Sequence, residues 1–280
     1  MASPPHTPFP DAPRIDRAAI SQALLTQTRV INALLLRESK SRYGQHKLGF
    51  LWALLEPLLM ISVFVGILSA MRNDSPGGMA LVPFMITGFV PFTMFRNPME
   101  NMQGAISSSK TLLAFPQVTT FDVILSRSLL ELAVLMCVLP FMLWMSWLLG
   151  LGFELRVQDP LSMLAACLLL WVLGSGLGFV FASLSPIMPS IRQVSVLVLG
   201  RPLLLTSGMF FTAESLPPVA RDWLLLNPIL HALDLIRAAC FYEFETDHGS
   251  WSYLCLWAGA TLAVGLLVHQ AVRRRAIVGL

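Results

Sequence analysis

The stretch RESKSRYGQHKLGFLWALLEP, residues 37–57, changes from charged to apolar halfway along. Its second half is apolar enough to enter a bilayer, although it ends with Glu56 and Pro57. This pattern is typical of a chain that leaves the membrane surface and begins to cross the bilayer. The charged side chains of the first half are Arg37, Glu38, Lys40, Arg42 and Lys47.

The whole chain is too apolar for a soluble protein. Of its 280 residues, 55% are hydrophobic and only 12% are charged, and its mean hydropathy is +0.69. A soluble domain carries about twice that charged fraction. A spanning segment needs about 20 mainly apolar residues, and lipid forces it to be helical. The sequence therefore predicts an all-α integral membrane protein with six transmembrane helices. The expected spans are 51–71, 80–98, 129–149, 161–184, 194–212 and 251–271.

The residues before the first span fall into two parts. Residues 1–13, MASPPHTPFPDAP, contain five prolines and no apolar segment, which predicts a disordered tail and not a signal peptide. Residues 15–36 show helical periodicity, and we expect an amphipathic helix lying along the membrane surface. The transmembrane domain then covers 14–280. The expected apolar face consists of Ile20, Leu24, Ile31 and Leu35.

The distribution of positive charge predicts the orientation. An even number of spans puts both termini on one side, and that side then carries fourteen of the 19 Lys and Arg residues. Positive charge marks the cytoplasmic face, so both termini are expected in the cytoplasm. Four tryptophans would form the opposite interfacial belt. They are Trp144, Trp147, Trp251 and Trp257.

Two connecting segments are too long to be simple turns. The inner one covers about 99–125 and the outer one about 213–250. The outer segment holds two apolar runs separated by Asn227 and Pro228, each too short to span a bilayer. We expect two short re-entrant helices that break at the proline. Irregular backbone at membrane depth is tolerated only inside protein or beside a water-filled cavity, which favours a conduit over an anchor.

Signatures of catalysis are missing. The chain has no GxxxxGK[ST], HExxH or GxSxG motif, and its five histidines are scattered. The ionisable residues expected within spans, Glu56, Glu131 and Arg201, lie on three different segments. An enzyme would need a convergent set, so we expect no catalytic residues, metal or cofactor. Arg201 would either form an ion pair with a span carboxylate or face an anionic substrate. Glu131 would pair with Arg127, one helical turn before it.

Small residues in the spans favour packing. Gly174 and Gly178 have GxxxG spacing, which allows close helix approach, and we expect this packing within one subunit. The cysteines have no CxxC spacing and are expected to pack as small apolar residues. They are Cys137, Cys167, Cys240 and Cys255.

The segment LLLRESKSRYGQHKLGFLWALLEP, residues 34–57, resembles the first-span motif of ABC-2 type transporter permeases, in particular those of capsular polysaccharide export. Three later stretches also resemble the family. They are FPQVTTFDVILSRSLLE at 115–131, GRPLLLTSGMFF at 200–211 and SLPPVARDWLLLNPILHALDLIRAACF at 215–241. The resemblance runs from about residue 20 to 275 and leaves the proline-rich tail outside.

The resemblance implies half of a transporter in the bacterial inner (cytoplasmic) membrane. Such permeases form homodimers with the path between subunits, and two copies of a separate ATPase subunit bind ATP and Mg. The implied substrate is a lipid-linked anionic polysaccharide. Further implied partners are a periplasmic polysaccharide co-polymerase-type adaptor and an outer-membrane export protein, together with membrane lipids. No nucleic acid is implied. The missing phosphate loop fits this arrangement, because the partner carries it.

The resemblance also places functional residues. A short coupling helix within 99–116 would dock on the ATPase, and the charged residues 37–47 would contact the ATPase, anionic lipid heads or both. Glu56 would lie at the interface, with the conduit at the dimer seam as the alternative. The ATPase-coupling candidates are Glu100, Ser107, Ser108, Lys110, Arg37 and Arg42.

Two further groups concern the path itself. Aromatic faces suit a sugar polymer because sugar C–H groups pack on them without fixed hydrogen bonds. The outer helices would act as a gate. The substrate-path candidates are Trp52, Glu56, Phe64, Phe92, Phe95, Arg201, Phe210 and Phe211. The outer-gate candidates are Trp223, Asn227, Pro228, His231 and Arg237.

Other functions stay open at this point. Within the same class, the cargo could be O-antigen, teichoic acid or a small hydrophobic molecule. In a different class, the chain could be an integral-membrane enzyme acting on lipid-linked glycans. An ion-coupled transporter is disfavoured, because no repeated half with paired broken spans is present.

Overall fold

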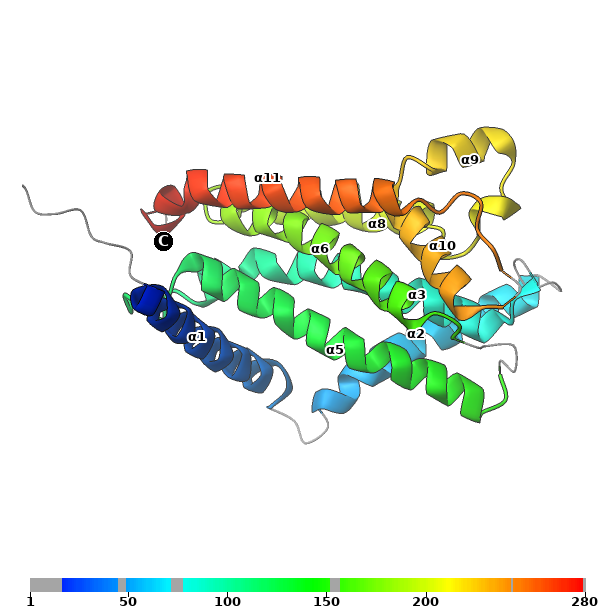
Figure 1. The fold of residues 1–280 in the computed structure, drawn as a ribbon, viewed down its shortest axis with the longest axis horizontal. Coiled ribbons are helices and arrows are strands. Elements are labelled where there is room, and N and C mark those ends of the chain that lie inside the picture. Colours follow the sequence, from blue (N-terminus) through cyan, green and yellow to red (C-terminus); the bar gives the residue numbers. More distant parts are fainter. Residues whose placement is uncertain (1–16, 45–48, 72–77, 152–156, 243, 279–280) are drawn as a thin grey trace, which may run out of the picture.

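The computed structural model describes residues 17–44, 49–71, 78–151, 157–242 and 244–278, and the predicted tail lies outside these ranges. Every regular element in the described ranges is a helix. Figure 1 shows most of the long helices running along one axis, with α1 and the end of α11 at one end and α9 at the other. We call these the α1 end and the α9 end. The long helices are α1 (Arg17–Tyr43), α2 (Gly49–Met71), α3 (Leu81–Asn101), α5 (Thr120–Leu148), α6 (Pro160–Leu184) and α11 (Trp251–Val278).

Four helices in the described part of the chain are long and apolar enough to cross a membrane. The bent pair α9 (Pro218–Leu224) and α10 (Pro228–Cys240) makes a possible fifth span. The all-helical membrane class is therefore confirmed, with four or five spans where six were expected. The four are Leu51–Ala70, Thr120–Leu148, Pro160–Leu184 and Trp251–Arg273.

The two remaining predicted spans take other forms. Residues 80–98 lie almost wholly in α3, whose side chains are buried without a break from Pro83 to Phe95. Residues 194–212 do not form one helix. They follow α7 (Ile191–Val194) as the π-helix η3 (Ser195–Gly200) and α8 (Arg201–Thr206), and then turn at Gly208, whose φ is +81°. Gly200, Pro202 and Gly208 interrupt this apolar run, because glycine and proline weaken a continuous helix.

Glycines set how closely the central helices approach. A Cβ on Gly174 would lie 2.1 Å from the carbonyl oxygen of Phe95, and one on Gly178 would lie 2.5 Å from Met102 Sδ. Because neither glycine has a side chain, α6 can pack closely against α3 and the turn after it. A Cβ on Gly176 would meet the backbone of α11 at 2.5 Å. The predicted packing of the GxxxG pair within one subunit is confirmed.

Side-chain caps determine where two spans begin. Thr119 and Asp122 form a capping box that starts α5 at Thr120, well before the predicted residue 129. The Asp122 carboxylate accepts from the backbone N–H of Thr119 at 3.0 Å. Asp159 caps α6 by accepting from the N–H groups of Leu161 and Ser162, both at 3.1 Å. These bonds satisfy N–H groups that a helix start otherwise leaves without partners.

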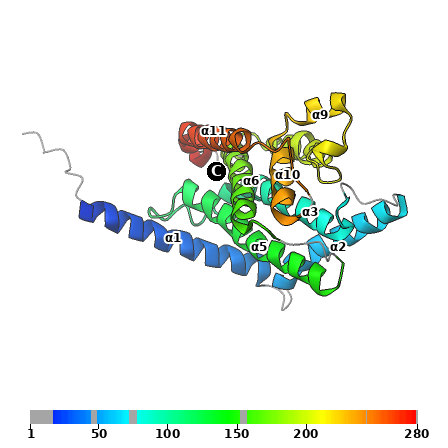
Figure 2. The same ribbon diagram turned by 45° about the vertical axis from the view of Figure 1, so that its right-hand side comes forward.

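Helix α1 lies diagonally across the first half of α5 (Figure 2). On α1, Leu34 is buried and Val30 beside it is half-buried. The predicted helix before the first span is confirmed, and the predicted break between two short outer helices is confirmed as well. α9 and α10 meet at 104° around Asn227 and Pro228.

Candidate translocation and coupling site

A buried carboxylate lies where α1, α3 and α5 meet. Glu131 is 2% exposed and forms an ion pair with Arg42 of α1. It also accepts hydrogen bonds from Asn101 Nδ2 at 2.7 Å and Asn97 Nδ2 at 3.4 Å. Partial burial lowers the pKa of Arg42, but the nearby Glu131 carboxylate outweighs it, so the pKa of Arg42 is raised. The Glu131 carboxylate therefore links α1, α3 and α5.

Arg127 forms a second junction beside the first. Its Nε lies 2.9 Å from Glu38 Oε1 on α1, and its Nη2 donates to Ser108 Oγ at 2.6 Å. Its Nη1 donates to the carbonyl oxygen of Asn101 at 3.2 Å. A cavity of about 120 Å³ lies between these groups and Glu131.

The predicted local pair between Arg127 and Glu131 is wrong. Each residue instead takes a partner from α1, Glu38 for Arg127 and Arg42 for Glu131. The spacing along α5 would have allowed the local pair. The packing of α1 on α5 brings an opposite charge to each residue. The two interhelical ion pairs then satisfy four ionisable groups.

We call the residues of these two junctions, Glu38, Arg42, Arg127 and Glu131, the polar cluster. Most coupling candidates belong to the polar cluster or border it. Residues 102–108 form a short 3-10 helix, η2 (Met102–Gly104), followed by α4 (Ala105–Ser108), within the predicted 99–116 range. Arg37 Nη2 donates to Ser109 Oγ at 3.1 Å, which joins α1 to the residue after α4. Ser107 and Lys110, which lie on either side of Ser109 in the sequence, are exposed. Glu100 instead forms an ion pair with Arg96, one turn before it on α3, at 3.2 Å.

A hydrogen bond joins this region to the interrupted fifth segment. Gln103 of η2 is 1% exposed, and its Nε2 donates to Ser195 Oγ at the start of η3 at 2.8 Å. A π-helix frequently marks a functional position. Sequence reasoning missed Gln103, and its only signal was a polar side chain between apolar neighbours.

Helix α2 has a face that the described residues leave without a packing partner. Trp52 is 61% exposed and Val63 is 57% exposed, and Glu56 lies exposed between them at helical spacing. Only 11% of the apolar window of α2 is buried within this chain. Two path candidates, Trp52 and Glu56, therefore share one face.

The aromatic path candidates divide into two groups. Phe64 and Phe210 are half-buried and meet edge to face, with ring centroids 5.0 Å apart. Phe211 is half-buried beside them in sequence. Phe92 and Phe95 of α3 have no exposed surface, so in this structure they face the core and not an open path. Arg201 begins α8, and its side chain lies outside the described residues.

Arg237 is the most enclosed of the gate candidates, with 0% exposure. Its Nη1 donates to the carbonyl oxygens of Gly208 and Phe211 at 2.8 and 3.0 Å. Its Nη2 donates to the carbonyl oxygen of Met209 at 3.2 Å, and its Cζ lies 4.0 Å from the centroid of the Phe84 ring. One guanidinium thus holds the turn after α8 against α10 and α3.

Asn227 and His231 fix the bend between α9 and α10. Asn227 Oδ1 accepts from the N–H of Ile229 at 3.0 Å, and its Nδ2 donates to the carbonyl oxygen of Thr206 at 3.1 Å. His231 Nδ1 accepts from the N–H of Ser250 at 3.2 Å, so Nε2 carries the proton and donates to the carbonyl oxygen of Leu225 at 2.7 Å.

The other two gate candidates lie at the same bend. Pro228 is the first residue of α10, where proline is tolerated because no helical N–H is lost. Trp223 of α9 is 73% exposed and is available to a membrane interface or another chain. In the described part of the chain, no three His, Cys, Asp or Glu side chains form a metal site.

Sequence reasoning also missed a buried histidine at the α1 end. His269 of α11 is 5% exposed, and its ring nitrogens lie 2.9 Å from Ser183 Oγ and 3.3 Å from Thr120 Oγ1. Its ring packs beside the rings of Phe121 and Phe179, which stack on each other. It therefore joins α5, α6 and α11, in a region that looked like the end of an ordinary span.

Comparison with known proteins places this architecture in a family. The family model described as ABC-2 type transporter matches residues 29–241. The chain is 34% identical over 255 residues to the capsule polysaccharide export inner-membrane protein CtrC of Neisseria meningitidis serogroup B. The aligned residues cover 90% of this chain and 94% of that protein.

Two further relatives give the same picture. The chain is 31% identical over 258 residues to the capsule polysaccharide export inner-membrane protein BexB of Haemophilus influenzae, covering 90% and 94% of the two chains. It is 29% identical over 244 residues to the polysialic acid transport protein KpsM of Escherichia coli, covering 87% and 93%. The chain with this polar cluster and with the turn held by Arg237 belongs to the ABC-2 type transporter family.

Proposed function

We propose that this chain is the inner-membrane permease subunit of an ATP-driven exporter that moves lipid-linked capsular polysaccharide. The observation that carries the proposal is similarity at 31 to 34% identity, over 90% of the chain, to proteins named for capsule polysaccharide export. The missing phosphate loop is consistent with a separate ATPase that binds ATP and Mg. The chain itself would supply a path and no catalytic residue.

The proposed assembly is a homodimer with two ATPase subunits. The exposed face of α2, with Trp52, Glu56 and Val63, supports a seam at this helix, because a long apolar helix with few partners in its own chain has surface left for a second copy. Arg201 and the Phe64–Phe210 pair would lie near the path. Both termini would be cytoplasmic, with six membrane-crossing segments in all if α3 and the α7–α8 run are counted.

Coupling would run through the polar cluster. The short helices at 102–108 would dock on the ATPase through Ser107 and Lys110, which are exposed. Movement there would reach α1 through Arg37 and Ser109, and the interrupted fifth segment through Gln103 and Ser195. The α9–α10 bend would close the opposite side. A periplasmic co-polymerase-type adaptor and an outer-membrane export protein would continue the path.

Co-purification tests the proposal directly. The tagged chain is isolated from native membranes, and bound proteins and glycolipids are identified by mass spectrometry. We expect a stoichiometric ATPase and an acidic glycolipid. Recovery of the chain with sugar nucleotide or a trimmed glycolipid, and no ATPase, would instead support an enzyme acting on lipid-linked glycans.

Lys110→Glu tests the docking role. Reversing this exposed charge should separate ATP hydrolysis from polysaccharide export in the reconstituted complex, because the ATPase would lose a contact on the loop that follows α4. The matched control is Arg221→Glu, a charge reversal on α9 near the opposite end. Normal export by the Lys110 variant would remove this residue from the docking surface.

A further inference from the structure

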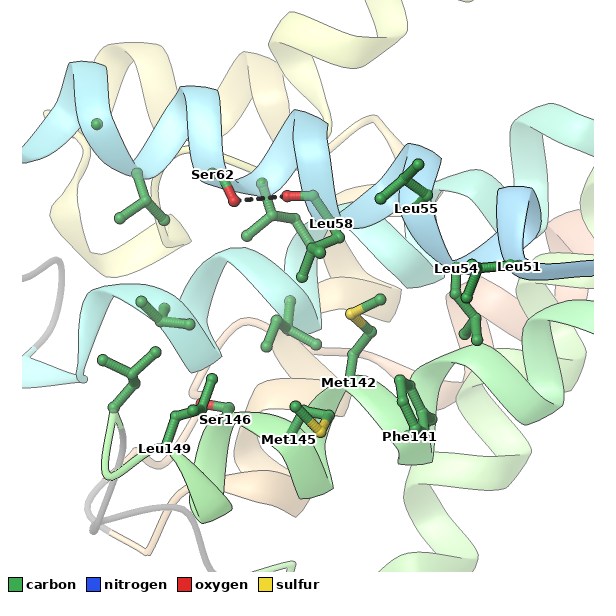
Figure 3. Close-up of a pocket in the computed structure, with 16 residues that line it drawn as sticks. Leu51, Leu54, Leu55, Leu58, Ser62, Phe141, Met142, Met145, Ser146 and Leu149 are labelled. Carbon is green, nitrogen blue, oxygen red and sulfur yellow. Dashed lines mark hydrogen bonds between the residues drawn. The ribbon is translucent and has the colours of Figure 1, made fainter. Parts of the chain in front are cut away.

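An apolar groove runs between α2, α3 and α5 and is separate from the proposed path (Figure 3). Its volume is about 650 Å³. On α2 it extends from Leu51 to Gly66, which is roughly 22 Å at about 1.5 Å per residue. Phe141, Met142 and Ser146 of α5 form the opposite wall. The groove is therefore long and narrow, and not a rounded cavity.

The surroundings of the groove restrict what can fill it. Among the described residues, every side chain that lines the groove is apolar except for the hydroxyl groups of Ser62 and Ser146. Two walls, α2 and α5, are helices long and apolar enough to cross a membrane. The medium beside the groove is then hydrocarbon rather than water, and a flexible chain of the same chemistry can enter it. A charged or sugar-like ligand would find no partner there.

The groove and the unpartnered face of α2 lie on different sides of the helix. Leu58 points into the groove, as Figure 3 shows, and is 46% exposed. Its neighbour Leu59 does not line the groove and is 51% exposed, on the side of Glu56 and Val63. The body of α2 therefore separates a ligand in the groove from a polymer or second subunit on the other face.

One polar atom in the groove indicates what kind of lipid fits. Ser146 is 3% exposed, and its hydroxyl has no hydrogen-bond partner among the described residues. Ser62 on the facing wall donates back to the carbonyl oxygen of Leu58 at 2.8 Å, as helical serines commonly do. A buried hydroxyl without a partner is unfavourable, so Ser146 favours a ligand that brings an acceptor.

The depth of Ser146 matches that of a lipid ester. Trp144 and Trp147, its neighbours on α5, are 53% and 56% exposed. Exposed tryptophans mark the headgroup level of a bilayer, and ester carbonyls lie next to that level. From there an acyl chain would extend along the groove past Leu58 toward Leu51.

We propose that the groove holds one acyl chain of a resident glycerophospholipid, whose ester carbonyl accepts a hydrogen bond from Ser146 Oγ after rotation about the Cα–Cβ bond turns the covered hydroxyl into the groove. The lipid belongs to the leaflet that meets the C-terminal end of α5. The acyl chain fills the gap between α2 and α5. It supplies packing that α2 otherwise lacks, because the described protein buries only 11% of the apolar window of this helix. This lipid is a structural partner and goes beyond the proposed export function.

Photolabelling tests this site in the full-length chain. The protein is placed in nanodiscs of phosphatidylethanolamine and phosphatidylglycerol that contain a trace of phosphatidylcholine with a diazirine in mid-chain. After irradiation, labelled peptides are mapped by mass spectrometry, before and after extensive detergent washing. We expect the label that survives washing to lie on the groove residues of α2 and α5, including Leu58 and Met142.

Matched variants separate the groove from the general lipid surface. Leu58→Trp should fill the groove and abolish the retained label, whereas Leu59→Trp should leave it unchanged. Ser146→Ala should lower lipid retention by roughly fivefold, the size expected for one neutral hydrogen bond. Ser62→Ala should have no effect, because its hydroxyl is already satisfied within α2.

Three results would overturn the proposal. Equal retained labelling of exposed leucines on α6, such as Leu161 and Leu168, would indicate surface lipid only. Absence of groove label in the unaltered chain would indicate that protein covers the groove. Recovery of glycan-bearing lipid alone from the groove, in protein from native membranes, would assign the site to the export substrate. Each outcome can be separated from the export function, which is measured by polysaccharide transport.

Discussion

At the scale of single residues, two ion pairs join α1 to α5. Glu131 is enclosed at 2% exposure, and Arg42 and Asn101 supply the donors that keep its carboxylate satisfied. Arg127 and Glu38 form the adjacent pair. A buried charge is tolerated when its hydrogen-bonding capacity is filled, so loss of either partner should weaken the α1–α5 contact.

Glu131→Gln tests this role. The variant keeps the size of the side chain but removes the charge that Arg42 faces, and we expect a loss of about 1 to 3 kcal/mol in stability. Denaturant unfolding of the purified full-length chain in detergent measures it. Glu100→Gln is the control, because that residue pairs with Arg96 at a more exposed i,i+4 position and should cost at most about 0.5 kcal/mol. Equal losses in both variants would contradict the account.

The pairing itself could not be predicted from sequence. The residues Arg127 and Glu131 stand one turn apart, which favours a local ion pair. The choice of partner depended on α1 packing beside α5, and nothing in the local spacing encodes that contact. The same holds for Gln103 and Ser195, which are 92 residues apart in sequence and hydrogen-bonded in the structure.

At the scale of helices, the starts and bends were predictable where a side chain caps an end. Asn227 followed by Pro228 predicted the break before α10, and the structure has it. The pair Thr119 and Asp122 carried an equal signal for the start of α5, but the longest apolar run began later and masked it. The interruption at 195–200 was harder to predict, because a π-helix has no strong sequence signature.

Asn227 has two separable roles at the bend. Asn227→Ala should lose both the cap of α10 and the bond to Thr206, costing about 1 to 2 kcal/mol. Asn227→Asp keeps the acceptor for Ile229 but loses the donor to Thr206, so its loss should be smaller, about 0.5 to 1.5 kcal/mol. Hydrogen exchange across 228–240 measures both. Identical exchange in the two variants would mean that the cap to the N–H of Ile229 contributes nothing.

At the scale of the whole molecule, composition was enough to predict an all-helical membrane protein. The number of spans did not follow as directly. Prolines and polar residues lower the apolar character of α3, and the 194–212 run is divided into short helices, so neither is among the four helices that are long and apolar enough to cross a membrane. The family resemblance supplied the partners, and the structure adds the surfaces on which they would act. The face of α2 that bears Val63 is the one we expect to meet a second copy.

Cysteine cross-linking locates that seam. In a background with the exposed Cys137 and Cys255 changed to Ala, Met60→Cys and Val63→Cys should give disulfide-linked dimers on oxidation in native membranes. Leu58→Cys, which faces the groove instead, is the matched control and should remain monomeric. Gel electrophoresis without reductant gives the result. Monomers for Met60→Cys and Val63→Cys, or dimers for Leu58→Cys, would place the seam elsewhere.

Arg237, which holds the turn after α8, also bears on the order in which the chain folds during synthesis. The carbonyl oxygens of Gly208, Met209 and Phe211 precede their donor, Arg237, by 29, 28 and 26 residues. During synthesis these acceptors emerge first and must stay hydrated or paired elsewhere until α10 follows. The turn and α10 therefore have to enter the bilayer together as one late unit, whereas α1 through α6 can assemble before it.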